Sequence, residues 1–152
     1  MNDLFIYYSA TGNGDEIAKY LKERGYPSLK LTTKTPIGKM SFFKMFRYGF
    51  RAIKEKKEEL APYEFDAMKT EGIILGSPIW GGRLSTPVLT FLKDHPEIKD
   101  QVKIVFLYSM SGKLKKAPEQ LQRFVPKATV INLESPCDNL DEMKRKVDQA
   151  LK

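Results

Sequence analysis

The chain has 152 residues, of which 41% are hydrophobic and 30% are charged, and this balance predicts one soluble, globular domain over residues 1–152 with a sizeable core. No apolar run is long enough to cross a bilayer and no basic region precedes the first apolar segment, so we expect no membrane insertion and no signal peptide. The formal net charge of +7 favours an acidic partner or an anionic ligand, whereas no zinc-finger spacing or nucleic-acid motif indicates specific nucleic-acid binding.

The chain begins with a strand–helix–strand pattern. Residues 3–9, "DLFIYYS", are nearly all apolar and β-rich, which predicts a buried strand. Residues 14–25, "GDEIAKYLKERG", follow with helical periodicity and end at Gly25, a common helix stop. The short apolar stretch at residues 28–31, "SLKL", predicts a second strand.

A long interval between Thr32 and Thr70 separates the second predicted strand from the third. Within it, residues 41–60 carry an amphipathic helical pattern. One interpretation is a helix with its apolar face in the core and a solvated basic back; the other is a docking surface for an acidic partner. The apolar face would hold Phe42, Phe46, Phe50 and Ile53, and the basic face Lys44, Arg47, Arg51 and Lys54.

The rest of the chain repeats the alternation of strand and helix. Strands are predicted at residues 71–78, 102–112 and 128–134, and helices at 85–95, 115–125 and 138–152. About five such repeats predict an α/β fold, a doubly wound three-layer sandwich with helices on both faces of a parallel sheet.

Ligands of open parallel sheets bind beyond the carboxyl ends of the strands. Three strand ends here carry loops of unusual composition. They are Ser9, Ala10, Thr11, Gly12, Asn13 and Gly14 after the first strand; Pro78, Ile79, Trp80, Gly81 and Gly82 after the third; and Ser109, Met110, Ser111 and Gly112 after the fourth.

The first loop has the composition of a phosphate site. Ser9, Thr11 and Asn13 offer side-chain donors, while the glycines allow backbone N–H groups to turn inward. A helix begins at once, so its free N–H groups and its dipole favour an anion at the same place. The loop is neither a nucleoside-triphosphate P-loop nor a dinucleotide fingerprint and has no lysine, so the phosphate is expected to be a binding handle rather than a transferred group.

The second loop holds Trp80, the only tryptophan of the chain. A tryptophan beyond a strand end can offer a flat face to a flat ligand. Gly81 and Gly82 allow a close approach and a peptide that turns over.

These loops resemble those of the flavodoxins and flavodoxin-like proteins. That family carries a T-x-T-G-N-T-type phosphate loop after the first strand, which reads "SATGNG" here, and many members carry "GSPIW", which stands intact at Gly76 to Trp80. The helix beginning "STPVLTFL" is similar to the family pattern P-x-V-x-x-F-L. The resemblance covers nearly the whole chain in order.

The resemblance implies a five-stranded parallel sheet in the order 2-1-3-4-5 and bound FMN. Ser9 to Gly14 would hold the FMN phosphate, Pro78 to Gly82 would line the isoalloxazine with Trp80 near or on a ring face, and Ser109 to Gly112 would complete the far side. In the family, the peptide after the aromatic residue can turn its carbonyl toward the flavin, and Gly81-Gly82 has the freedom for this.

Three features depart from the family pattern. Gly14 stands where the family has a hydroxyl, and we expect threonine there to tighten the grip on the phosphate. The fourth-strand loop lacks the tyrosine that many flavodoxins stack on the flavin, and Met110 or Tyr108 is left as a substitute. The chain is basic where many flavodoxins are acidic, and Gly82 replaces an aspartate of some relatives.

The functional expectation is an FMN-binding electron carrier in the cytoplasm, a monomer or weak dimer that serves redox partner proteins with acidic contact surfaces. Two alternatives stay open: a flavin-dependent oxidoreductase of a quinone, porphyrinogen or similar small molecule, and a flavin-free binding or regulatory module. No nucleophile–base pair and no metal site is visible. His95 is expected to be a surface histidine, and Cys137, the single cysteine, a plain loop thiol that excludes an internal disulfide framework.

Overall fold

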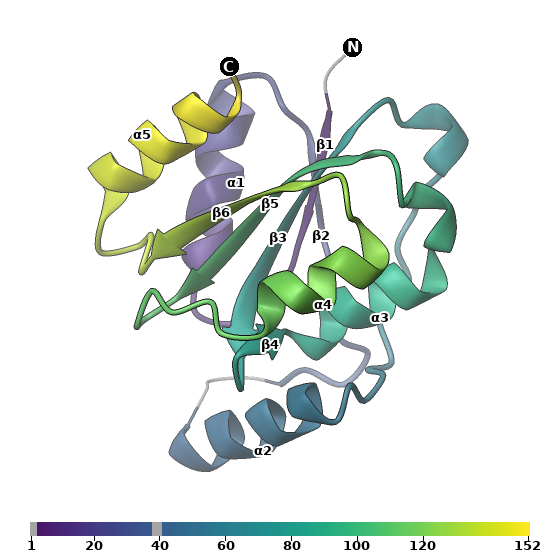
Figure 1. Ribbon diagram of the computed structural model, residues 1–152, viewed down its shortest axis with the longest axis vertical. Helices are drawn as coiled ribbons and strands as arrows, with labels where there is room; N and C mark the ends of the chain where they lie inside the picture. Colours follow the sequence, from purple (N-terminus) through teal and green to yellow (C-terminus); the bar gives the residue numbers. More distant parts are fainter. Residues whose placement is uncertain (1–2, 38–40) are drawn as a thin grey trace.

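The computed structural model of the protein describes residues 3–37 and 41–152 and shows a central sheet between two layers of helices (Figure 1). The parallel strands lie in the order β2-β1-β3-β5-β6, and a short β4 pairs antiparallel with β3. Counted without β4, this confirms the predicted order 2-1-3-4-5. The strands are β1 (Leu4–Tyr7), β2 (Ser28–Lys30), β3 (Ile73–Trp80), β4 (Arg83–Leu84), β5 (Val102–Ser109) and β6 (Thr129–Glu134).

The described residues also form five α-helices and two short 3₁₀ helices. They are α1 (Asn13–Glu23), α2 (Phe42–Ile53), α3 (Thr86–Asp94), α4 (Ala117–Phe124) and α5 (Leu140–Ala150), with 3₁₀ turns at Ala67–Lys69 and Pro96–Ile98. Helix α1 ends at the predicted stop: Gly25 has a φ of 87°, and the N–H groups of Gly25 and Tyr26 donate to the carbonyls of Lys22 and Leu21. This is a Schellman cap, which needs a residue that accepts a positive φ. Among the described residues, no helix is both long enough and apolar enough to span a bilayer.

The apolar strands are explained by burial on both faces. Along β1, Phe5 and Tyr7 pack into a cluster with α1 and α5, whereas Ile6 points to the other face and packs with α3 and α4. Successive strand residues point to opposite faces, so a strand covered on both sides is apolar throughout. Figure 1 shows α1 and α5 on one face of the sheet and α3 and α4 on the other.

Helix α2 forms where the sequence predicts a helix, but of the two interpretations the one that packs its phenylalanine face in the core is wrong. Phe46 is 75% exposed and Phe50 is 56% exposed, while Gly49 and Ala52 are buried. The two small residues let the helix backbone approach the turn after β3: a Cβ at Gly49 would lie 3.4 Å from the Gly81 nitrogen. Periodicity predicts a helix, but not which of its faces packs. The side chain of Phe42 lies outside the described residues.

The predicted basic face of α2 is partly occupied by contacts within the chain. Lys44 Nζ donates to the Ile37 carbonyl at 2.6 Å, and Arg51 Nε pairs with the Glu58 carboxylate at 3.0 Å. Arg47 is exposed. Only part of the predicted stripe therefore faces outward for a partner.

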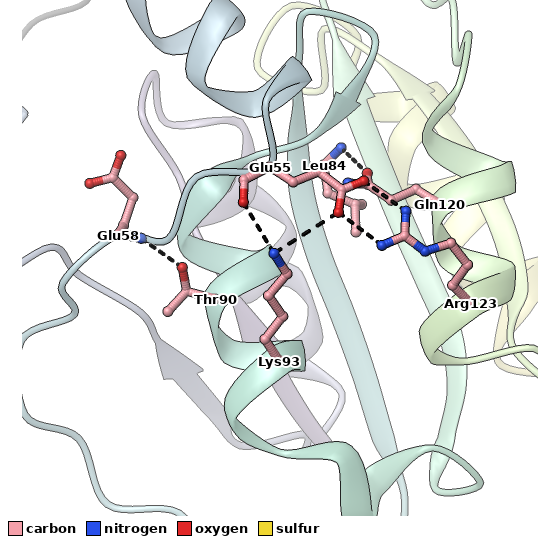
Figure 2. Close-up of polar contacts among 7 residues, drawn as sticks. All are labelled: Glu55, Glu58, Leu84, Thr90, Lys93, Gln120 and Arg123. Carbon is pink, nitrogen blue, oxygen red and sulfur yellow. Dashed lines mark hydrogen bonds and ion pairs between the residues drawn. The ribbon is translucent and has the colours of Figure 1, made fainter.

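The end of α2 is fastened to α3 and α4 by the network in Figure 2. The Glu55 carboxylate accepts from both terminal nitrogens of Arg123, at 2.7 and 2.8 Å. Lys93 Nζ donates to the Glu55 carbonyl at 3.1 Å, and the Glu58 N–H donates to Thr90 Oγ1 at 2.8 Å. These bonds fix the segment after α2, and so hold the helix near the carboxyl ends of the strands, where the predicted ligand loops meet.

We expect Glu55→Gln to lower the free energy of unfolding by about 1–2 kcal/mol at neutral pH, because it removes one charge of a partly buried pair with two hydrogen bonds. The hydrogen bonds from Arg123, opposed by burial, lower the pKa of Glu55 below its usual 4.5. A lowered pKa contributes stability above that value and loses it as the pH falls through the folded-state pKa. The difference between parent and variant in urea denaturation should therefore shrink in acid.

Glu142→Gln is the matched control, since Glu142 accepts a similar pair of bonds from Arg145 on the exposed surface of one helix. Equal losses from both variants would show that the Glu55 network contributes no more than a surface ion pair.

Candidate functional site

A cleft of about 420 Å³ lies where the three predicted loops converge, at the carboxyl ends of β1, β3 and β5. It brings together residues from each loop and adds three that lie outside them. Its walls are Ala10, Thr11, Asn13, Met45, Tyr48, Pro78, Ile79, Trp80, Gly81, Tyr108, Ser109, Met110 and Ser111. The other predicted residues, Ser9, Gly12, Gly14, Gly82 and Gly112, do not line it.

The turn after β1 is built as an anion cradle. Gly12 has a φ of 93° and precedes the first residue of α1. Ser9 Oγ accepts from the N–H groups of Gly12 and Gly14, at 3.2 and 3.1 Å, which fixes the turn from beneath. The N–H groups of Thr11 and Asn13 donate to no acceptor among the described residues. Two free donors at a helix N-terminus are suited to an anionic oxygen.

A segment far along the chain supports this cradle. Asn13 Oδ1 accepts from the backbone N–H of Cys137 at 3.0 Å, and Asn13 Nδ2 lies 3.5 Å from Thr11 Oγ1. Burial, with the nearby carboxylate of Glu16, raises the pKa of the Cys137 thiol, so the thiol stays protonated at neutral pH. Cys137 lies in a loop, where its thiol is exposed, and its backbone N–H orients a cradle residue. No sequence signal links positions 124 residues apart.

The interpretation of Gly14 as a vacant hydroxyl position is wrong. A Cβ at Gly14 would lie 2.5 Å from the Tyr108 hydroxyl and 2.8 Å from a Tyr7 ring carbon. Gly14 is a glycine because two tyrosines close over the first turn of α1, not because a donor has been lost.

Gly14→Thr is therefore expected to destabilise the protein by about 1–3 kcal/mol through overpacking, rather than to tighten ligand binding. Thermal unfolding of the variant measures this, with Lys19→Ala on the exposed side of α1 as the control. A variant that melts with the parent would mean that Tyr7 and Tyr108 yield to the new side chain.

Trp80 lies within a strand rather than beyond its end, because β3 runs as far as Trp80. Its side chain is only 8% exposed and packs between two tyrosines: the Tyr8 ring centroid is 5.6 Å away, nearly perpendicular, and the Tyr48 centroid is 5.5 Å away. Trp80 therefore forms part of an aromatic wall of the cleft, packed against both tyrosine rings.

Gly81 and Gly82 form the two-residue turn of the β3–β4 hairpin. Trp80 pairs with Arg83, and the two glycines have φ values of 58° and 78°. A two-residue hairpin of this kind needs positive φ at both central positions, which explains the glycine pair. At Gly81 a Cβ would meet the Gly49 carbonyl oxygen at 2.5 Å, whereas at Gly82 it would meet only the Lys115 side chain.

The loop after β5 supplies an exposed side chain and a buried one. Met110 is 75% exposed at the cleft, whereas Tyr108 is 1% exposed and donates its hydroxyl hydrogen to the Tyr8 carbonyl. Of the two residues considered for covering a ligand face, Met110 is exposed at the cleft, whereas Tyr108 is buried beneath it. Burial raises the pKa of Tyr108 well above its usual value and that of Tyr8 to about 12, so both are neutral at physiological pH.

Among the described residues, no aspartate, glutamate, histidine, lysine or arginine lines the cleft, and no group of histidine, cysteine, aspartate and glutamate could hold a metal ion. His95 follows the C-terminal end of α3, outside the cleft lining, and is partly exposed. Its side chain is 19% exposed, with Nε2 2.7 Å from the Tyr63 hydroxyl and Nδ1 2.9 Å from Glu97. The ring packs 4.5 Å from Phe91, centroid to centroid, which covers it.

Comparison with known proteins identifies similar folds among solved structures. No protein-family model matches the chain, and no curated protein matches it significantly. A flavoprotein from Lactobacillus acidophilus NCFM, solved in complex with FMN, is similar with a TM-score of 0.69 and 20% identity, over 93% of this chain and 97% of that one.

Two further structures extend the likeness. A protein from Bacteroides eggerthii DSM 20697 that is assigned as a flavoprotein gives a TM-score of 0.68 at 16% identity, over 96% of this chain and 98% of that one. A flavodoxin, WrbA-like protein from Agrobacterium tumefaciens gives 0.55 at 15% identity, over 98% and 96%. Together with the strand order and the two helical layers, these similarities show that the chain has the flavodoxin-like fold.

Proposed function

We propose that the protein binds FMN in this cleft and carries electrons between redox partners. One observation supports the proposal above the others: a single cleft joins a helix N-terminus with free N–H donors to a space walled by flat aromatic rings. FMN has the matching parts, a phosphate and a planar isoalloxazine. The similar structure from L. acidophilus holds FMN in the same fold, which supports the assignment.

In this proposal each loop has a distinct task. The N–H groups of Thr11 and Asn13 and the Thr11 hydroxyl hold the phosphate. Trp80 and Tyr48 border the isoalloxazine, and Met110 covers it from the β5 side. The flavin supplies the one- and two-electron chemistry, while the chain binds it, orients it and excludes water.

The residues of the cleft favour a carrier. Catalysis on a small molecule commonly needs a positioned proton donor or acceptor with a pKa near neutrality. The lining holds no carboxylate, histidine or lysine, and its buried tyrosine, Tyr108, stays neutral.

A flavin-dependent oxidoreductase on the same site is the second candidate. The cleft is bordered by Met45 and Tyr48 of α2, an apolar wall that an apolar substrate would contact. The net charge of the whole chain, +7, also differs from that of the acidic electron carriers that its loops resemble.

Steady-state turnover separates the two candidates. We expect the FMN-loaded protein to reduce a quinone only slowly with NADH or NADPH, because one small domain shows no second glycine-rich loop for a dinucleotide. As the control, dithionite-reduced protein should pass electrons rapidly to a one-electron acceptor such as ferricyanide. Rapid turnover with a pyridine nucleotide alone would favour the enzyme.

A further inference from the structure

Helix α2 exposes several large apolar side chains. Phe46 is 75% exposed, Phe50 56% and Ile53 46%. Their spacing of four and three residues places them along one line of the helix, which we call the α2 outer face. Contiguous exposed apolar side chains commonly mark an interaction site, whereas apolar residues scattered singly over a surface do not.

A basic edge runs beside the α2 outer face. Arg47 follows Phe46 and Lys54 follows Ile53, so each lies about 100° around the helix from its apolar neighbour. Both are exposed, and no ion pair to either is found among residues 3–37 and 41–152. Lys54 Nζ stands 5.4 Å from the Phe50 ring, which places an ammonium at the border of the apolar strip.

The position of α2 links this surface to the cleft. Figure 1 shows α2 at the periphery of the molecule, outside the layer of α3 and α4. Met45 and Tyr48 of the same helix line the cleft, and Met45 lies about 100° around the helix from Phe46. Whatever contacts the α2 outer face therefore lies within about one helix diameter, roughly 10 Å, of the cleft.

We propose that α2 docks the protein on an anionic lipid surface, lying along the surface without crossing it. A short helix with phenylalanines on one side and arginine and lysine beside them matches the chemistry of helices that lie in the headgroup region. The aromatic side chains enter the boundary of the acyl chains, and the basic edge meets the phosphates of anionic lipids. The net charge of +7 adds attraction in the same direction.

A second copy of the chain fits the α2 outer face less well. The exposed parts of Phe46, Phe50 and Ile53 offer roughly 350 Å², if an aromatic residue buries about 150–250 Å² in full, against about 800 Å² per partner in a stable interface. In an antiparallel two-fold pair of α2 helices, the two basic edges would also fall on the same side and repel each other. A flat anionic surface needs no self-complementary interface area and attracts the basic edge instead of repelling it.

The inference goes beyond the proposed carrier function and does not depend on it. Docking through α2 holds the cleft beside the lipid, where apolar electron acceptors partition. Vesicle binding needs no flavin, so its failure and the failure of FMN binding are separate results.

The test is co-sedimentation of the full chain with vesicles of neutral phosphatidylcholine, alone or with one third phosphatidylserine. We expect binding to the anionic vesicles only. Phe46→Ser with Phe50→Ser should lower the affinity by about ten-fold or more, and so should Arg47→Glu with Lys54→Glu. Because these side chains are exposed, the variants should melt with the parent.

Two control variants match these changes elsewhere on the surface. Met68→Ser with Leu140→Ser removes apolar groups that are 95% and 40% exposed, and Lys22→Glu with Lys99→Glu makes the same change in net charge at exposed sites. Both control variants should bind nearly as the parent does.

No binding to anionic vesicles would overturn the proposal and leave a protein partner as the occupant of the α2 outer face. If the control and test variants lost equal affinity for the anionic vesicles, the binding would be non-specific electrostatic attraction, which would contradict docking through α2. A dimer in light scattering that Phe46→Ser with Phe50→Ser converts to a monomer would assign the face to a second copy.

Discussion

Gly81→Ala is expected to destabilise the protein by about 2–5 kcal/mol, which corresponds to a fall of about 4–20 °C in melting temperature. Two costs add. The φ of 58° at Gly81 is unfavourable for a residue with a Cβ, by about 1–2 kcal/mol. The new Cβ would also lie 2.5 Å from the Gly49 carbonyl oxygen, which belongs to the backbone of α2 and cannot move without shifting the helix. Thermal and urea unfolding measure the change.

The neighbouring Gly82→Ala is the control for conformation. Its φ of 78° brings a similar conformational cost, but a Cβ there meets only the flexible side chain of Lys115, at 2.9 Å. We expect a loss of about 1–2 kcal/mol. Equal losses at the two positions would mean that the approach of α2 to the hairpin adds nothing, and that the cleft wall formed by Met45 and Tyr48 is not fixed by this contact.

The second large effect is expected in ligand binding: FMN should bind about 100-fold or more tightly than riboflavin, which differs only in lacking the phosphate. A phosphate at a helix N-terminus gains up to about 2 kcal/mol from the dipole, and each good hydrogen bond to a charged acceptor adds about 1.5–3 kcal/mol. Together these exceed the 2.7 kcal/mol that corresponds to a 100-fold ratio. Calorimetric titration of both ligands measures it.

Two variants test whether the turn after β1 is the source of the difference in affinity between FMN and riboflavin. Thr11→Ala removes a hydroxyl from the turn after β1 and should weaken FMN by about ten-fold, with little effect on riboflavin. Ser111→Ala removes a hydroxyl from the β5 loop on the same cleft and should change both affinities alike. If Thr11→Ala affects both ligands equally, the phosphate lies elsewhere.

The central strands could be predicted from the sequence because both helical layers cover them. Phe5 and Ile6 serve opposite clusters, so both positions must be apolar and the run stands out. The glycine and hydroxyl residues at the strand ends were equally visible, since tight turns and helix starts restrict residue choice locally. These local constraints led to ten of the thirteen residues that line the cleft.

The remaining features depend on contacts between distant segments. Helical periodicity at Phe46 and Phe50 resembles that of a core helix, and only the buried Gly49 and Ala52 show which side faces the protein. Similarly, the crowding at Gly14 comes from Tyr108, which a sequence pattern at residues 9–14 cannot include.

The most direct test of the account is the fluorescence of Trp80, the only tryptophan, during titration with FMN. Because Trp80 lies in the wall of the cleft, a flavin bound there should remove most of its emission in a saturable way, at concentrations at which riboflavin leaves it nearly unchanged. Emission that stays constant at saturating FMN would contradict the central claim that this cleft holds the flavin.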